Sequence, residues 1–173
     1  MFTKFKNYPL KGIGSQVTEK ILTQFEESLP KILPDDYREF LKQYNGGLMG
    51  EMNHAFYIQG IPEFTETQSG EECYLDSFDS IKFDESEGVG DLLSQYKFYR
   101  NEKVFPEYFF PIGSDVGGGL VILSLGDTDY GHIYYWDHEE GWDEAGSLEP
   151  DYSHCYFVAK SFTEFIDSLR CST

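Results

Sequence analysis

Apolar residues recur at helical spacing in a segment near the N-terminus. From Ile21 to Leu29 they follow one another at steps of one, three and four residues, which is typical of an amphipathic helix. Thr18, just before this run, is a residue that favours the N-cap position. Pro30 follows the run and is incompatible with continuing the helix. We therefore predict a helix that begins near Thr18 and ends before Pro30.

A second helical pattern begins with the residues Leu33-Pro34-Asp35-Asp36. A proline and two acids suit the first turn of a helix, because that turn has free N–H groups and a positive dipole end. An apolar stripe at positions i, i+3, i+4 and i+7 follows, consisting of Tyr37, Phe40, Leu41 and Tyr44. The stripe predicts a core-facing surface. Asn45-Gly46-Gly47 then ends the helix, because these residues tolerate positive φ.

Short β-rich runs replace the helical pattern after residue 47. They predict strands at residues 54–58, 78–83, 109–113, 120–125, 132–137 and 156–159. Pro111 lies inside one run and indicates an edge strand or a strand end. A Gly- and Asp-rich turn at 126–131 joins two of the runs, which predicts a β-hairpin. The polar, acidic segments 65–72 and 84–90 are predicted loops.

Two further helices complete the predicted elements. One spans residues 92–100, and Asp91 or Ser86 is available to cap it. The other begins after Ser161 and is predicted to place one apolar face toward the core, consisting of Phe162, Phe165, Ile166 and Leu169. Helices first, then strands, then a closing helix indicate the α+β class, with an antiparallel β-sheet flanked by helices. The length of 173 residues and the absence of a linker predict a single domain over 1–173.

The net charge of −18, from 31 acidic and 13 basic residues, limits the partners of this chain. Phosphate binding needs clustered Lys and Arg, so we expect no nucleic acid partner, and an anionic membrane surface would repel the protein. The longest apolar runs, 120–123 and 133–136, are too short to span a bilayer. Composition alone favours charge that serves solubility, and charge that attracts a basic partner is the alternative.

The cysteines indicate a reducing compartment. Cys73, Cys155 and Cys171 are odd in number, widely spaced and without a C-x-x-C pair, which is typical of free thiols. No signal peptide pattern follows the N-terminal lysines. We therefore expect a cytoplasmic protein.

Candidate catalytic and metal-binding motifs are weak. Gly117-Gly118-Gly119 is followed by a β-rich run and has no nearby Lys, so it predicts a turn rather than a phosphate-binding loop. The Asp127-x-Asp129 pair begins like a calcium loop, but His138 takes the position of the required Glu. We expect no catalytic residue, no metal and no cofactor.

One metal alternative remains open. The residues His132, His138, His154 and Cys155 lie close in sequence, although they lack the tight ligand pairs of structural zinc sites. A metal-dependent hydrolase that uses the three histidines is the corresponding functional alternative.

Ordered motifs in the two halves of the chain resemble one family. The first is Leu-Pro before the helix that ends in Asn-Gly-Gly at 45–47, and the second is Ile-Gly-Ser-Asp at 112–115, followed by glycines and by Trp-Asp-His at 136–138. The closing helix carries Ser-Phe-x-Glu-Phe-Ile at 161–166. Together these motifs resemble the SUKH superfamily, the Smi/Knr-type proteins, over about residues 17–170. Val116, between Asp115 and the glycines, departs from the family pattern.

The resemblance implies an α+β domain and a protein that binds another protein instead of catalysing a reaction. In bacteria it implies an immunity protein that neutralises a cognate protein toxin, often a nuclease or a deaminase. Fungal relatives are regulators of cell-wall assembly, so an intracellular regulatory scaffold without a toxin partner is the alternative function.

The resemblance also gives the charge a possible role. Toxins that act on nucleic acid need basic surfaces, and an acidic inhibitor would be steered toward them. The densest acidic segment with an aromatic residue supplies the predicted partner-binding residues, which are Asp137, Glu139, Glu140, Trp142, Asp143 and Glu144. Trp142 is the candidate anchor, with packing on its own sheet as the alternative. A second candidate segment spans 63–72.

Overall fold

The computed structural model of the chain describes residues 2–50, 54–57, 72–82, 90–138 and 154–171. Within these residues the helices are α1 (Lys4–Asn7), α2 (Glu19–Glu26), α3 (Asp35–Gln43), α4 (Leu92–Asn101) and α6 (Phe162–Ser168). The strands are β1 (Gly47–Leu48), β2 (His54–Tyr57), β3 (Glu72–Phe78), β4 (Phe109–Asp115), β5 (Leu120–Ser124), β6 (Ile133–Trp136), β7 (Cys155–Ala159) and β8 (Arg170–Cys171).

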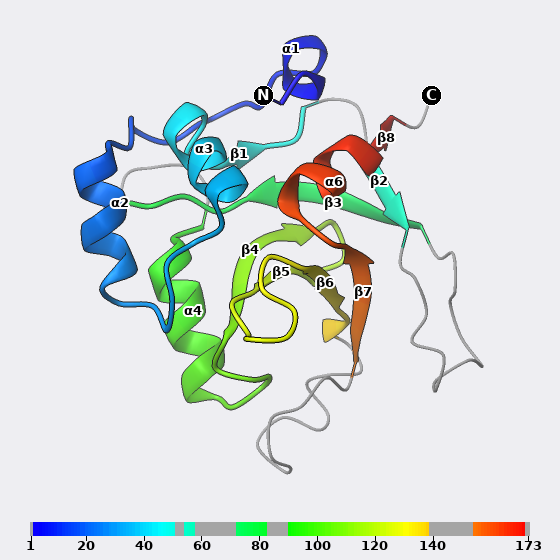
Figure 1. The fold of residues 1–173 in the computed structure, drawn as a ribbon. Helices are drawn as coiled ribbons and strands as arrows, with labels where there is room; N and C mark the ends of the chain where they lie inside the picture. Colours follow the sequence, from blue (N-terminus) through cyan, green and yellow to red (C-terminus); the bar gives the residue numbers. More distant parts are fainter. Residues whose placement is uncertain (1, 51–53, 58–71, 83–89, 139–153, 172–173) are drawn as a thin grey trace.

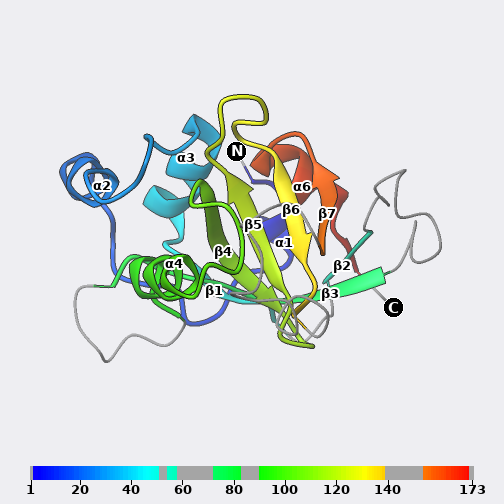
Figure 2. The ribbon, with the colours of Figure 1, turned by 90° about the horizontal axis from the view of Figure 1, so that it is seen from below.

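The strands form one antiparallel sheet in the order β7-β6-β5-β4-β3-β2-β8, and β1 pairs with β3 beside this path. Helices α3 and α6 lie side by side against the sheet (Figure 1). Seen from below, α2, α3 and α4 lie nearer to β4, and α6 lies nearer to β7 (Figure 2). The predicted α+β class with an antiparallel sheet is confirmed.

Strand β5 is buried on both of its faces. All five of its side chains are buried: Val121 and Leu123 belong to the main core, and Leu120 and Ile122 belong to a smaller cluster with Trp136. Burial on both faces explains why the sequence of this strand is a continuous apolar run and does not alternate between apolar and polar residues.

Aromatic rings join α3 to α6 and to the sheet. The ring centroid of Phe40 lies 4.9 Å from that of Phe78 and 4.9 Å from that of Phe162, a spacing at which ring pairs attract. Phe2 and Phe5, from the N-terminal segment, pack on Phe40 from outside. The predicted stripe of α3 is thus part of the core, where Tyr37, Phe40 and Leu41 are fully buried.

The predicted N-caps of three helices are present. The Thr18 side chain accepts a hydrogen bond from the N–H of Ile21 at the start of α2. Asp91 caps α4 in the same way, and Ser161 caps α6. Each cap satisfies an N–H group that the helix itself leaves free.

Asn45 connects three separate segments after the end of α3. Its φ is 47°, and its buried amide bonds to the O of Ser15 at 2.9 Å and to both the O and the N of Ile81, at 2.9 and 2.8 Å. Gly46 follows with φ of 81°, and a Cβ there would lie 2.6 Å from the O of Asp79. The Asn-Gly-Gly motif therefore ends α3 and also holds the N-terminal segment and the end of β3 together.

The structure corrects the prediction for the third strand. A strand was expected at 78–83, but β3 spans Glu72–Phe78 and begins where a loop was predicted to end. After Phe78 the chain leaves the sheet. Ser80 then forms a bridge with Asp91 at the start of α4. Buried Cys73 and Leu75 alternate with more exposed neighbours, which is the pattern of a strand. Sequence reasoning missed this pattern because the preceding residues 65–72 have the polar, acidic composition of a loop.

The prediction of an edge position for Pro111 was wrong in one respect, because β4 lies between β3 and β5. Strand β3 pairs with β4 only from Gly113 onward, however, whereas Pro111 pairs with Ile122 of β5. The register also shifts between Pro111 and Gly113. Pro111 therefore lies at an irregularity where its missing N–H removes no bond to β3, which is where a proline is tolerated in a sheet.

Replacing Asn45 tests its connecting role. We expect Asn45→Ala to lower the free energy of unfolding by about 2–4 kcal/mol, because both backbone groups of Ile81 lose a buried partner. Denaturant unfolding at neutral pH measures this change. Asn45→Gly is the matched variant, since it keeps the preference for positive φ and removes only the amide. Wild-type stability of Asn45→Gly would show that φ, and not the hydrogen bonds, requires Asn at this position.

Candidate functional site

One end of the sheet collects three of the connections between strands. The pairings Tyr57↔Glu72, Ser114↔Leu120 and Trp136↔Cys155 lie where β2, β4 and β6 end and where β3, β5 and β7 begin. The connections 58–71, 116–119 and 139–153 therefore start and finish at the same end of the strands. We call this the loop end of the sheet.

The glycine run at the loop end is a turn, as predicted. The Asp115 carboxylate accepts hydrogen bonds from the N–H of Gly117 at 2.9 Å, the N–H of Gly119 at 2.8 Å and the hydroxyl of Tyr135 at 2.9 Å. A Cβ on Gly119 would lie 2.2 Å from that hydroxyl, and Gly118 has φ of 93°. Burial and the Asp115 carboxylate raise the pKa of Tyr135, which keeps the hydroxyl protonated as a donor.

Two predicted residues follow β6 at this end. The N–H of Asp137 donates to the O of His154 at 3.0 Å, which continues the pairing of β6 with β7. The imidazole of His138 lies beside the glycine turn, since a Cβ on Gly118 would be 3.6 Å from its Cε1. Asp137 and His138 are both partly exposed. The start of the predicted partner-binding segment is thereby placed next to the turn that Asp115 organises.

Most of the predicted partner-binding segment lies outside the described residues. This applies to Glu139, Glu140, Trp142, Asp143 and Glu144. Of the second candidate segment, 63–72, only Glu72 lies within the described residues, as the first residue of β3. Both segments connect strands whose described ends meet at the loop end of the sheet.

The negative charge is unevenly distributed along the chain. Segments 51–53, 58–71, 83–89 and 139–153 contain 13 of the 31 acidic residues and none of the 13 Lys and Arg residues. The described remainder contains 18 acids and 13 bases and is therefore much closer to neutral. Nine of the 13 acids belong to the two long segments that connect at the loop end. Charge that serves only solubility has no need of such a separation.

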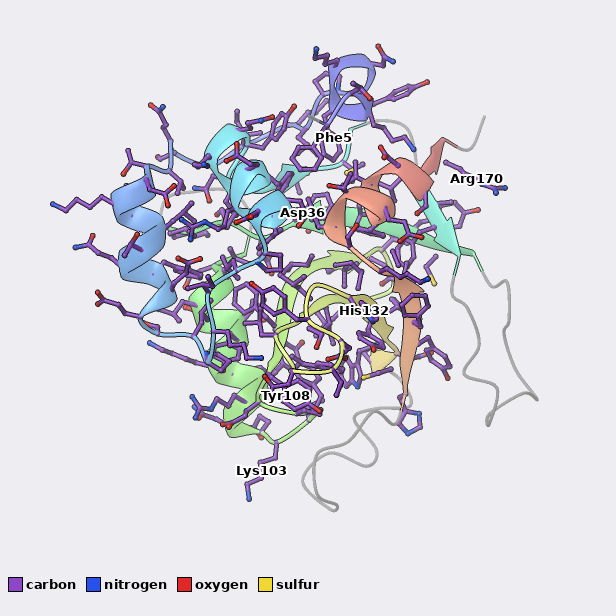
Figure 3. All side chains as sticks on the ribbon, in the orientation of Figure 1. Phe5, Asp36, Lys103, Tyr108, His132 and Arg170 are labelled. Atoms are coloured by element: carbon purple, nitrogen blue, oxygen red, sulfur yellow. The ribbon has the colours of Figure 1, made fainter. Side chains whose placement is uncertain are left out.

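The three histidines of the metal hypothesis do not come together. His132 precedes β6, beside the rings of Tyr134 and Phe157, and it is labelled in Figure 3. His138 follows the same strand, and six residues of extended chain span roughly 20 Å. Among the described residues, no group of three or more His, Cys, Asp or Glu side chains is placed to hold a metal ion. The separation of His132 from His138 argues against the metal-dependent hydrolase.

Asp127 and Asp129, the pair that resembles the start of a calcium loop, bond to different partners. Asp127 forms an ion pair with Lys31. Asp129 is buried, and its two oxygens accept hydrogen bonds from the hydroxyls of Ser124 at 2.7 Å and Tyr134 at 2.9 Å. Each carboxylate thus has a partner within the protein, Asp127 in the α2–α3 connection and Asp129 in the hairpin, which explains both residues without a cation.

Sequence reasoning missed one carboxylate with unusual chemistry. Asp79, which follows β3, is buried, and its pKa is raised from 3.8 to about 6. Burial is the main cause, the charge of Asp91 adds to it, and the charge of Lys82 and the N–H of Gly90 oppose it. In a chain with 31 acids, no sequence signal distinguishes this one. The Asp79 side chain lies against Gly90, just before α4, and at the opposite end of β3 from the loop end.

Comparison with known proteins identifies the family. The sequence profile of the SMI1 / KNR4 family (SUKH-1) matches residues 16–168. The chain belongs to this family. The match spans α2 to α6 and so includes strands β1 to β7 and both motif blocks, and the resemblance seen in the sequence is confirmed.

A curated relative of this SUKH-1 protein is the "SPbeta prophage-derived uncharacterized protein YokK" of Bacillus subtilis (strain 168). The two are 27% identical over 159 residues, which cover 88% of this chain and 74% of the relative. Within the described part of this SUKH-1 chain, no helix is long and apolar enough to cross a membrane.

The raised pKa of Asp79 predicts how the free energy of unfolding depends on pH. The folded protein binds this proton more tightly than the unfolded chain does, so ionisation of Asp79 destabilises the fold as pH rises from about 4 to 6, and the loss persists above 6. We expect Asp79→Asn to become more stable relative to the wild type by about 2 kcal/mol between pH 4 and pH 7.

Urea unfolding of both proteins across this pH range measures the difference. Asp76→Asn is the matched control, because Asp76 is an exposed carboxylate on the same strand. A difference between Asp79→Asn and the wild type that stays constant with pH would contradict a raised pKa at Asp79.

Proposed function

We propose that this chain is a cytoplasmic immunity protein that binds and neutralises a cognate protein toxin through an acidic surface. The toxin domain is of the basic, nuclease or deaminase type, and the chain contributes no catalytic step. Membership of the SUKH-1 family supports the general role. The observation that carries the acidic surface is the concentration of acids, without any Lys or Arg, in segments joined at the loop end of the sheet.

The partner-binding residues of this proposal are those of the segment after β6. They are Asp137, Glu139, Glu140, Trp142, Asp143 and Glu144. Carboxylates at the rim of an interface mainly accelerate association with a basic partner. An aromatic residue among them supplies the apolar contact that slows dissociation, and Trp142 has this role in the proposal.

The structural frame favours such a use of the loop end. Asp115 and Tyr135 hold the turn between β4 and β5, and the bond from Asp137 to His154 extends the β6–β7 pairing to the base of the acidic segment. Val116, at the tip of the turn, has 65% of its surface exposed. The departure from the family pattern at this position thus places an exposed apolar side chain at the loop end of the sheet.

Charge reversal in the acidic segment tests the proposal. We expect the double variant Asp143→Lys/Glu144→Lys to associate about 10-fold more slowly with the toxin domain encoded in the adjacent reading frame, at low salt. The deficit shrinks as salt rises, because screening weakens attraction between exposed charges. Stopped-flow or surface plasmon resonance measurements over a salt series give the rates.

The matched control is Glu39→Lys/Asp167→Lys, which changes the net charge equally at exposed positions of α3 and α6. Equal slowing in both double variants would show that only the total charge matters. Unchanged affinity and salt dependence of the first variant would contradict the proposed site. A toxin domain that does not bind the wild-type protein would contradict the function and favour the regulatory scaffold.

A further inference from the structure

Two exposed residues, Ile32 and Tyr130, belong to connections that are hydrogen-bonded to each other at the end of the sheet opposite to the loop end. Ile32, in the α2–α3 connection, is 66% exposed, and Tyr130, in the β5–β6 turn, is 40% exposed. The Tyr130 hydroxyl donates to the O of Ile32 at 2.8 Å, across 98 residues of sequence. Lys31 forms an ion pair with Asp127 and lies 5.7 Å from the centre of the Tyr130 ring. We call these four residues the Ile32–Tyr130 surface.

The two connections that carry this surface are both held from inside. The buried Asp129 carboxylate fixes the β5–β6 turn by accepting bonds from two hydroxyls. On the other side, the buried Glu26 carboxylate accepts the N–H of Leu33 at 2.9 Å and is paired with Arg38. A surface that is already ordered loses little conformational entropy on binding, and this favours affinity.

The surroundings of the Ile32–Tyr130 surface are negative. Asp35 is exposed next to it, and Asp36 is partly exposed. Burial raises the pKa of Tyr130, the carboxylates of Asp35, Glu26 and Asp36 raise it further, and the charge of Arg38 lowers it. The Lys31 ammonium is already engaged by Asp127. Asp36, labelled in Figure 3, lies between the starts of α3 and α6 and accepts the N–H of Thr163.

Exposed apolar side chains that are scattered singly need no explanation, but Ile32 and Tyr130 are joined in a rigid pair with an acidic rim. This is the arrangement of an interface: an apolar centre that includes a tyrosine, surrounded by polar groups. The sign of the rim selects a basic partner.

We infer that the Ile32–Tyr130 surface is a second contact surface for the basic toxin domain, which places an apolar pocket over Ile32 and Tyr130. The inference rests on the proposed function. The chain from Tyr130 to Asp137, which includes strand β6, spans roughly 20 Å. A standard interface covers about 800 Å² on each partner, roughly 30 Å across, so one toxin domain is large enough to contact both places.

Neutral substitutions test this surface separately from the acidic segment. The probe is the toxin domain encoded in the adjacent reading frame, bound to the full chain, and wild-type binding is measured first. We expect Ile32→Asn and Tyr130→Ala each to raise Kd by about 10- to 30-fold. Neither variant changes the net charge, so their effect persists at high salt, unlike that of charge reversal at Asp143 and Glu144.

Ile13→Asn is the matched control, because Ile13 is an isoleucine that is 51% exposed elsewhere on the surface. Thermal unfolding of all three variants checks that the fold is kept. Toxin binding that is weakened in Ile32→Asn and Tyr130→Ala but normal in Ile13→Asn supports the surface. Normal affinity of the first two variants, or equal loss in Ile13→Asn, overturns the surface and leaves the proposed function standing. No binding to the wild type overturns both.

Discussion

Burial of both faces of β5 is the constraint on which the rest of the fold depends. One face needs the rings of α3, α6 and the N-terminal segment, and the other needs the cluster around Trp136. With both faces covered, the strand ends are where side chains of this sheet have the most direct access to a partner. The acidic segments join the sheet at one such end, and the Ile32–Tyr130 surface lies at the other.

Polar residues of the family motifs act mainly as internal connectors. Asn45 bonds to residues 15 and 81, and Asp115 holds a turn against Tyr135. Each of these groups is satisfied within the fold, as buried polar groups generally must be. These motifs therefore identify the fold, and their side chains are used within it.

The excess of acidic over basic residues is concentrated in particular segments of the chain. The described residues have 18 acids and 13 bases, and several pair in the α2–α3 network of Glu19, Glu26, Arg38 and Lys42. The remaining 13 acids belong to segments without any base. Because most acids of the described residues are balanced by bases, like-charge repulsion among these residues is limited.

The sequence by itself determined the helices other than α1, the hairpin, the α+β class and the family, because these follow from local periodicity, caps and ordered motifs. It also located most of the acidic excess, although total charge did not separate solubility from recognition. Only the tertiary structure decided that β3 ends at Phe78, that Pro111 lies at an irregularity inside the sheet, and that Asp79 is buried. It also decided that Ile32 meets Tyr130 and that His132 and His138 lie at opposite ends of β6. Each of these depends on contacts between residues far apart in the chain, or on which way a strand runs, and local patterns of hydrophobic and polar residues contain neither.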